Sequence, residues 1–293
     1  MSKIVLITGA SSGFGRDTAC TLSAKGFTVF ASMRDIAGKN KASADALMQQ
    51  GINVVELDVT DTSSIDKAVA QIIQQTGRID VLINNAGVAS AGVSEAFTDE
   101  QVQALFDVNV IGLHRVTRAV LPNMRDNKNG LIINIGSILG RVTFPFFGLY
   151  GASKFAVEAI SDSLGYELSQ FGVDVTLVQP SAFPTQMYAS ADQPEDLMRV
   201  VDYGDVGKIP TNMFSHFMQL FESEDSPNPH DVSEAITKVV QLPKGTRPAR
   251  LVVGGSFGAD VINDATAPVQ YATVKALGLE HLDPQNKTAK EIA

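Results

Sequence analysis

Short apolar runs and longer amphipathic segments alternate along most of the chain. The apolar runs, rich in Val, Ile and Leu, cover residues 3–7, 27–32, 53–57, 79–83, 131–135, 173–178 and 250–253. Between them, apolar positions recur at helical spacing over residues 14–25, 38–50, 62–76, 99–125, 150–171 and 230–242. Strands that alternate with helices predict an α/β fold, a doubly wound parallel sheet of about seven strands with helices on both faces.

The first apolar run leads directly into a glycine-rich turn, TGASSGFG, at residues 8–15. Glycines there allow positive φ and close backbone approach to a pyrophosphate, and the following helix offers N–H groups to an anion. Such turns also join strands to helices without a ligand, and three residues rather than one separate the first two glycines. The place after the first strand of a βα series favours phosphate binding. The candidate contacts are Gly9, Ser11, Ser12, Gly13, Phe14 and Gly15.

Arg34 follows the second strand, where a dinucleotide fold reaches the adenosine ribose. An arginine fork there pairs with a 2′-phosphate, whereas an acid accepts from a free 2′-hydroxyl. Arg34, with the hydroxyl of Ser11 in the glycine turn, favours NADP over NAD. Asp35 leaves the opposite interpretation open, because an acid one position away could bind the ribose instead.

Polar residues also follow the third and fourth strands. Asp58 could hold the adenine amino group, or it could cap the helix over residues 62–76. The fourth strand ends in Asn84-Asn85-Ala86-Gly87, whose amides can link neighbouring strand ends beside a ligand. Asn109, in the middle of a long helix, indicates a kink, a polar role or an exposed amide. His114 on the same helix is expected to be packed or solvated rather than catalytic.

Ser137, Tyr150 and Lys154 carry the candidate chemistry. Tyr150 and Lys154 are four residues apart, which places both on one face of a helix, and Ser137 follows the fifth strand. A phenol titrates near pH ~10, and we expect the ammonium one turn away to lower its pKa. Tyr150 could then exchange a proton with a carbonyl or alcohol oxygen that Ser137 hydrogen-bonds, while nicotinamide exchanges hydride with the adjacent carbon. A tyrosine and a lysine four residues apart occur by chance on many helices. Chance is a poor explanation for this pair together with the glycine turn, the asparagine strand end and Ser137.

An apolar loop over residues 142–147 and a Met- and Phe-rich stretch after the sixth strand point to a hydrophobic substrate. We interpret residues 183–230 as a lid over that substrate, although Met and Phe at helical spacing also occur as plain core. The candidate substrate contacts are Ser137, Leu139, Phe144, Phe147, Tyr150, Met187, Met213 and Phe217.

Composition narrows the classes of protein. A chain of 293 residues with 44% hydrophobic side chains fits one domain over residues 1–293 better than two, with a frayed tail over residues 283–293. The net charge of −9 argues against a nucleic-acid partner, and four scattered histidines predict no metal site. The single Cys20 indicates a buried thiol in a reducing compartment. No secretory signal or membrane-length apolar run is expected, so we predict a cytoplasmic protein.

Taken in order, these motifs resemble those of the short-chain dehydrogenase/reductase family, from Ile4 to about Gly254. The family's glycine motif corresponds to Thr8–Gly15, and its Asn-Asn-Ala-Gly strand end to Asn84–Gly87. Its helix asparagine and its catalytic Ser, Tyr and Lys correspond to Asn109, Ser137, Tyr150 and Lys154. The resemblance implies a Rossmann-type fold and an NADP(H)-dependent reaction between a carbonyl and an alcohol.

The resemblance also implies individual roles. Lys154 would bind the nicotinamide ribose, Asn109 would help hold a water in a proton relay, and Asp58 with the Val59 backbone would contact adenine. Arg34 and Ser11 are placed as in NADP-preferring members, including those similar to hydroxysteroid and retinol dehydrogenases. The remaining implied cofactor contacts are Asn85, Ala86, Gly87, Tyr150, Pro180, Phe183 and Thr185.

Two points qualify the implied picture. The family's Pro-Gly after the sixth strand is Pro180-Ser181 here, which puts the path of that loop in question. Members commonly form homodimers or homotetramers through the helices at 99–125 and 149–171, yet the C-terminal part could block one interface. The competing class is a non-catalytic NADP(H)-binding sensor or scaffold, which has no reason to keep the Ser, Tyr and Lys together.

Overall fold

The structure, a computed structural model, describes residues 2–284. These residues form one seven-stranded parallel sheet in the order β3-β2-β1-β4-β5-β6-β7, which confirms the predicted fold class. The strands are β1 (Ile4–Ile7), β2 (Thr28–Met33), β3 (Asn53–Glu56), β4 (Val81–Asn84), β5 (Gly130–Ile135), β6 (Val173–Pro180) and β7 (Arg250–Val253). Their bounds lie within two residues of the predicted ones, because buried parallel strands are continuous apolar runs.

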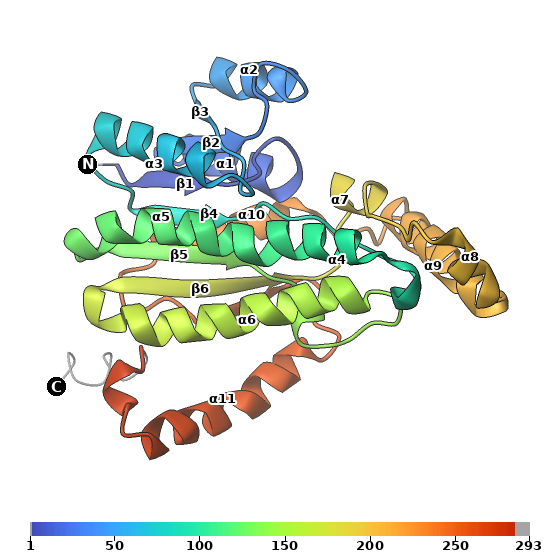
Figure 1. Cartoon of the computed structure of the whole chain (residues 1–293). Coiled ribbons are helices and arrows are strands. Elements are labelled where there is room, and N and C mark those ends of the chain that lie inside the picture. The colour runs from blue at the N-terminus through green and yellow to red at the C-terminus, as the bar shows by residue number, and fades with distance from the viewer. Residues whose placement is uncertain (1, 285–293) are drawn as a thin grey trace.

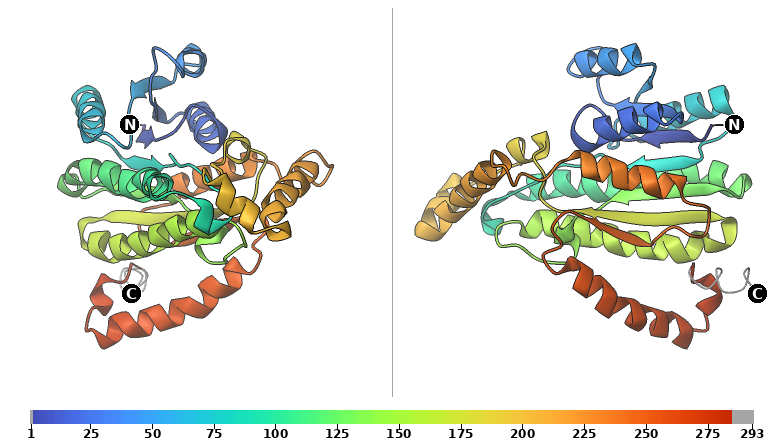
Figure 2. Two further views of the ribbon diagram at one scale, coloured as in Figure 1. Left: turned by 45° about the vertical axis from the view of Figure 1, so that its right-hand side comes forward. Right: turned by 180° about the vertical axis from the view of Figure 1, so that it is seen from behind.

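Helices cover both faces of the sheet (Figures 1 and 2). On one face lie α1 (Gly13–Ala24), α2 (Lys41–Gln49) and α10 (His230–Gln241). On the other lie α3 (Thr62–Thr76), α5 (Leu113–Asp126) and α6 (Gly148–Leu168). Side chains alternate along each strand, so Leu6 packs under the second group while Ile7 packs under the first. Cys20 on α1 is partly buried and packs against the first group's core, so the predicted buried thiol is only partly covered.

The strand order reverses beside β1, whose two neighbours are β2 and β4. In an open parallel sheet the crevice at the carboxyl ends of the strands next to such a reversal is where ligands bind. The glycine turn follows β1 and Asn84–Gly87 follows β4, so the reversal brings two segments separated by about 75 residues of chain to the same crevice.

The long helix predicted over residues 99–125 has a wider middle. It consists of α4 (Asp99–Phe106), a π-helical segment η2 (Asp107–Gly112) and α5. A capping box between Thr98 and Gln101 starts α4. Asn109 lies within η2, so the regular α-helix is interrupted at this asparagine, as one of the predicted alternatives requires.

Three helices extend beyond the carboxyl edge of the sheet, on the right of Figure 1. They are α7 (Gln186–Ala189), α8 (Leu197–Asp202) and α9 (Asp205–Phe221), which lie within residues 183–230, the predicted lid. A further helix, α11 (Ala259–Ala276), has no counterpart among the predicted elements. No helix within residues 2–284 has both the length and the apolar character needed to cross a membrane. Of the predicted frayed tail, residues 285–293 lie outside the described residues.

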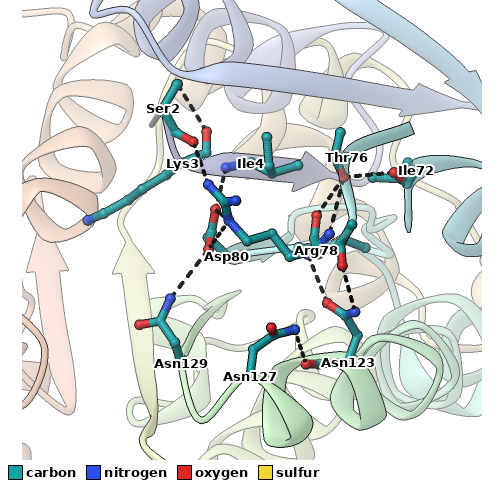
Figure 3. A network of polar contacts seen from close by, with 12 residues as sticks. Ser2, Lys3, Ile4, Ile72, Thr76, Arg78, Asp80, Asn123, Asn127 and Asn129 are labelled. Atoms are coloured by element: carbon teal, nitrogen blue, oxygen red, sulfur yellow. Dashed lines mark hydrogen bonds and ion pairs between the residues drawn. The ribbon is translucent and has the colours of Figure 1, made fainter. Parts of the chain in front are cut away.

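A polar network fixes the opposite, amino-terminal edge of the sheet (Figure 3). The carboxylate of Asp80, 8% exposed, accepts hydrogen bonds from the backbone N–H of Ile4 at 2.7 Å and from Arg78 Nε at 3.0 Å. Asn129, just before β5, donates its amide to the same carboxylate at 3.3 Å. One carboxylate thus ties together the starts of β1, β4 and β5.

Asp80→Ala should lower the free energy of unfolding by about 3 kcal/mol, because it removes the buried carboxylate that accepts hydrogen bonds from Arg78 and from the Ile4 N–H. Urea titration followed by circular dichroism measures this. The control is Asp45→Ala, which breaks only the exposed pair between Lys41 and Asp45 and should cost less than about 0.5 kcal/mol. Equal losses in the two variants would contradict the role of Asp80.

Candidate active site

The glycine turn is held against the end of β4 by close approach and by amide hydrogen bonds. Gly9 has φ +67°, and a Cβ on it would lie 2.8 Å from Ala86 Cα. Asn85 donates its side-chain amide to the carbonyls of Thr8 at 2.8 Å and Gly9 at 3.0 Å. Thr8 Oγ1 in turn accepts from the N–H groups of Asn85 and Ala86, each at 3.0 Å. The predicted linking of strand ends by these amides is confirmed.

The first turn of α1 is open to an anion. Gly13 has φ +53°, and its nearest neighbour beyond the turn is the Thr185 side chain, 3.8 Å from the position of a Cβ. Within the described residues, no side chain caps this helix at Ser12. Uncapped N–H groups and the positive end of the helix dipole are what a phosphate binds. The turn therefore fits a dinucleotide pyrophosphate.

At the adenosine end, Arg34 and Asp58 face each other. Arg34 Nη1 lies 3.8 Å from Asp58 Oδ2, and the arginine side chain is 62% exposed. Asp35 has φ +48° and turns its carboxylate into its own loop, where Oδ2 accepts from the N–H of Lys39 at 2.7 Å. Arg34 is thus the residue of the two that is free to reach a ligand at this edge.

The helix-cap interpretation of Asp58 is wrong. Its Oδ1 accepts from the N–H of Thr60 at 2.9 Å and from the Thr60 hydroxyl at 2.7 Å, within an Asx turn. The cap of α3 is Asp61, whose side chain accepts from the N–H of Ser63 at 2.8 Å. The backbone of Asp58 is itself fixed, because its N–H donates to Ser64 Oγ at 3.0 Å.

The structure brings Ser137, Tyr150 and Lys154 together. Tyr150 and Lys154 lie one turn apart on α6 and are 8% and 5% exposed. Lys154 Nζ donates to the Ile135 carbonyl at the end of β5 at 2.9 Å and lies 5.6 Å from the centre of the Tyr150 ring. Ser137 caps the short helix η3 (Ile138–Gly140), its Oγ accepting from the N–H of Leu139 at 3.1 Å.

Burial dominates the protonation of both groups. It raises the pKa of Tyr150 to about 12, and the hydrogen bond with Ser137 opposes this as the smaller of the two effects. It lowers the pKa of Lys154 to about 8, since an ammonium loses hydration there. The expectation of a lowered pKa for Tyr150 is therefore wrong for the chain without its cofactor, because burial is the largest influence on the phenol. At neutral pH the phenol keeps its proton and is a donor.

Asn109 joins the loop after β4 to the start of α6. Its Oδ1 accepts from the N–H of Val88 at 2.9 Å, and its Nδ2 donates to the Val88 carbonyl at 2.9 Å and to Ser153 Oγ at 3.1 Å. Ser153 donates its hydroxyl to the Tyr150 carbonyl at 2.7 Å. At 2% exposure, Asn109 is not an exposed amide, and its side chain holds backbone on both sides of the site.

One cavity connects these groups to the glycine turn. Predicted residues that line it include Phe14, Asn85, Ser137, Leu139, Phe147, Tyr150, Lys154, Pro180, Phe183, Thr185 and Met187. Sequence reasoning missed others on its wall, among them Ala89, Gly136, Ser181 and Tyr188. Tyr188 is the clearest omission, because it stands next to Met187 and is the only tyrosine of the α7 sequence QMYA.

Three predicted substrate contacts lie outside this cavity. Phe144 packs edge-on against Phe257, with ring centres 5.6 Å apart. Met213 and Phe217, on α9, line a separate apolar groove of the lid. Phe217 nevertheless approaches the cavity wall, with ring centres 6.4 Å from Phe147 and 6.1 Å from Tyr188.

Serine fits the loop position where the family has glycine. The N–H of Ser181 donates to the Val253 carbonyl at 2.9 Å, continuing the pairing of β6 with β7, and Ser181 needs no positive φ. The residue that requires glycine here is Gly254, directly after β7. It has φ +86°, and a Cβ on it would meet Ser181 Oγ and the Phe183 ring. Phe183 is 1% exposed and packs edge-on against Phe14 at 5.6 Å.

A doubly wound sheet with a glycine turn at the strand-order reversal, and a buried Tyr-Lys pair beside it, defines a class of dinucleotide-binding enzymes. The family profile described as short chain dehydrogenase matches residues 3–196. The chain belongs to this family of oxidoreductases, and the predicted resemblance is confirmed.

Relatives and a solved structure agree. The chain is 38% identical to a 3-ketodihydrosphingosine reductase of Bacteroides thetaiotaomicron over 240 residues, which are 81% of this chain and 83% of the relative. It is 33% identical to the 17-beta-hydroxysteroid dehydrogenase type 1 of Homo sapiens over 251 residues, 83% of this chain and 75% of the relative. A solved short-chain dehydrogenase from Streptomyces avermitilis is similar with a TM-score of 0.76 and 30% identity, over 95% of this chain and 97% of that chain.

The lowered pKa of Lys154 predicts a pH-dependent stability. From pH 8 to pH 10.5 the unfolded chain binds the Lys154 proton more tightly than the folded chain, so the stability of the wild type rises with pH in that window. Over that window the free energy of unfolding of the wild type should rise by about 3 kcal/mol more than that of Lys154→Met.

Urea titrations at several pH values measure this difference. Lys67→Met, on the exposed side of α3, is the matched control and should follow the wild type. Parallel curves for wild type and Lys154→Met would refute the lowered pKa.

Proposed function

We propose that the protein is an NADP(H)-dependent oxidoreductase that interconverts a hydrophobic carbonyl compound and its alcohol. The observation that carries this proposal is the convergence of Ser137, Tyr150 and Lys154 on one cavity that also reaches the glycine turn. Tyr150 holds a proton at neutral pH, as reduction of a carbonyl requires of its acid.

Each side chain has a separate task. Tyr150 donates its proton to the substrate oxygen in reduction and takes it back in oxidation, and Ser137 hydrogen-bonds that oxygen. Bound NADPH supplies the hydride for the adjacent carbon. Lys154 stabilises the deprotonated phenol and binds the nicotinamide ribose, with its position set by the Ile135 carbonyl. Asn109 helps hold the water through which the proton is restored from solvent.

The cofactor contacts follow the crevice from end to end. Arg34 pairs with the 2′-phosphate, supported by its exposure and by the inward turn of Asp35. Asp58 and the Val59 backbone receive adenine at the end of β3. The pyrophosphate takes the open first turn of α1, at Ser12 and Gly13. The nicotinamide end is bounded by Asn85–Gly87, Pro180, Phe183 and Thr185.

The substrate is apolar near its reacting carbon. The wall around Tyr150 carries Leu139, Phe147 and Met187, and beyond it the lid offers the groove of Met213 and Phe217. The names of the two relatives, a ketodihydrosphingosine reductase and a hydroxysteroid dehydrogenase, also indicate lipid-like compounds. We assign residues 183–230 as the cover that closes over such a substrate within a single domain.

We further propose a cytoplasmic homodimer or homotetramer. Ile111 on η2 and Phe155 on α6 are 46% and 43% exposed, on the helices through which family members associate. A non-catalytic sensor or scaffold is the second candidate, and oxidation of NADPH against a panel of apolar ketones and aldehydes separates the two.

Tyr150→Phe should lower kcat by at least about a hundredfold, because it removes the proton donor while keeping the ring. Binding of NADPH, measured by fluorescence titration, should change by less than about threefold. Tyr166→Phe, a half-buried tyrosine on the same helix, is the matched control and should keep full turnover. Normal turnover by Tyr150→Phe would remove its assigned role.

Arg34→Ala should reduce kcat/KM for NADPH by about tenfold to a hundredfold and leave that for NADH nearly unchanged, because only the 2′-phosphate loses its partner. Lys41→Ala, an exposed cation at the start of α2, is the control. An unchanged preference in Arg34→Ala, with a changed one in Asp35→Asn, would transfer the reading of the ribose to Asp35.

A further inference from the structure

A buried carboxylate lies next to the catalytic residues and has no part in the reaction described above. Glu158 is one turn beyond Lys154 on α6, two turns beyond Tyr150, and 3% exposed. A buried carboxylate is costly unless charged groups and hydrogen bonds satisfy it. Its partners therefore show what it holds in place.

The first partner comes from the turn that carries Ser137. Arg141, directly after η3, places Nη2 3.0 Å from Glu158 Oε2, and its side chain is 15% exposed. The turn is pressed onto α6, since a Cβ on Gly140 would lie 3.0 Å from both Glu158 Cγ and the Lys154 carbonyl. The ion pair adds a charged link to this contact, while Ser137 itself hydrogen-bonds with the N–H of Leu139 and with Tyr150.

The other partners come from β6 and β7. Gln179, the residue before Pro180, is fully buried and donates its amide to Glu158 Oε1. Its side-chain Oε1 accepts from the Asn263 Nδ2 on α11 at 2.7 Å. Arg250, at the start of β7, places Nε 2.9 Å from Glu158 Oε2. The same carboxylate thus also fixes the strand that leads into the loop at Pro180 and Ser181.

We propose that Glu158 is a positioning residue for the active site. It holds the Ser137 turn through Arg141 and the exit of β6 through Gln179, at fixed places relative to Tyr150 and Lys154 on its own helix. Because the Tyr150–Lys154 pair, the Ser137 turn and the exit of β6 belong to three separate elements, one side chain on α6 that binds the other two sets their mutual geometry. This inference rests on the proposed function.

The ion pairs indicate that loss of Glu158 would affect the Ser137 turn more than the start of β7. Asp162, one turn further along α6, pairs with Arg250 as well, so Arg250 keeps a carboxylate without Glu158. Arg141 has its ion pair with Glu158, and burial already lowers the pKa of its guanidinium. Without that carboxylate the guanidinium must turn to water, and the turn at Gly140 moves with it.

Glu158→Gln should lower kcat for a ketone by about tenfold to a hundredfold while the Kd for NADPH changes by less than about threefold. Asp162→Asn is the matched control, since it removes a charge from the same helix and the same Arg250 but does not touch Arg141, and it should keep kcat within about twofold. Arg141→Gln breaks the pair from its less buried side and should reproduce the loss, so the test does not depend on how well Glu158→Gln folds.

A second comparison separates positioning from general stability. In a Ser137→Ala background, Glu158→Gln should lower the residual kcat by less than about threefold, because the group that it positions is already gone. A full, additive loss in that background, or an equal loss in Asp162→Asn, would overturn the inference.

The wild type distinguishes the two levels of the argument. A wild-type chain that turns over no ketone or aldehyde of the panel overturns the proposed function. An active wild type whose Glu158→Gln variant keeps its kcat overturns this inference alone and leaves the roles of Ser137, Tyr150 and Lys154 intact.

Discussion

The burial of one amino group, Lys154 Nζ, is the constraint to which the rest of the site is fitted. An ammonium cut off from water needs replacement partners, and the structure provides the Ile135 carbonyl and the face of the Tyr150 ring. Neither is a carboxylate, so the pKa of Lys154 falls to about 8 and the amine is easily returned to either protonation state. A carboxylate beside Nζ would hold the proton and remove this freedom. Glu158, one turn away, instead forms ion pairs with Arg141 and Arg250.

The same burial explains why the phenol is a proton donor by default. With the pKa of Tyr150 raised to about 12, loss of its proton needs a compensating positive charge close to the ring. The groups that can supply one are the Lys154 ammonium and, in the proposed reaction, an oxidised nicotinamide, which would accompany the deprotonated phenol both after reduction of a carbonyl and before oxidation of an alcohol. The sequence pattern assigned the stabilisation of the deprotonated phenol to Lys154 alone. We expect the charge of the bound nicotinamide to contribute to it as well.

A second buried network holds the strands under the site at fixed distance. Asn84, at the end of β4, donates its amide to Asn134 Oδ1 on β5 and to Thr117 Oγ1 on α5, both at 2.9 Å. Asn134 donates to Ser161 Oγ on α6 at 2.9 Å, and Ser161 donates to the Val157 carbonyl at 2.7 Å. Polar groups that satisfy one another in a core specify one arrangement of the elements around them. The helix with Tyr150 and Lys154 is therefore referenced to the sheet.

Features encoded by neighbouring residues were predictable from the sequence. The strands, the glycine turn and the shared face of Tyr150 and Lys154 depend on spacings of a few residues, and each is confirmed. The cap of α3 is Asp61 rather than Asp58. Both acids stand shortly before the helix, and the sequence pattern does not distinguish which of them is the N-cap. The widened turn at Asn109 was visible only as a helix-unfriendly asparagine.

Features that depend on distant contacts were not predictable. Burial raises the pKa of Tyr150 where a lowered pKa was expected, and this burial depends on the tertiary fold. The contacts of Glu158 with Arg141 and Gln179 depend on it as well. Helix α11 escaped notice for another reason, since Pro268 interrupts its pattern and few of its side chains are buried. An amphipathic signal needs a core to face, and this helix has little of one.

The division between fixed and exposed parts follows from what each must do. Catalytic groups have to keep their geometry, and they sit on α6, on η3 and at strand ends that two buried polar networks tie down. A cover has to admit an apolar molecule, and the lid helix α9 has no buried residue at all, while Leu197, Met198 and Val201 on α8 are each about two-thirds exposed or more. Few buried contacts mean a low free energy of local opening. The lid can therefore open locally at a lower free energy than the elements around Tyr150, as the proposed role of a cover requires.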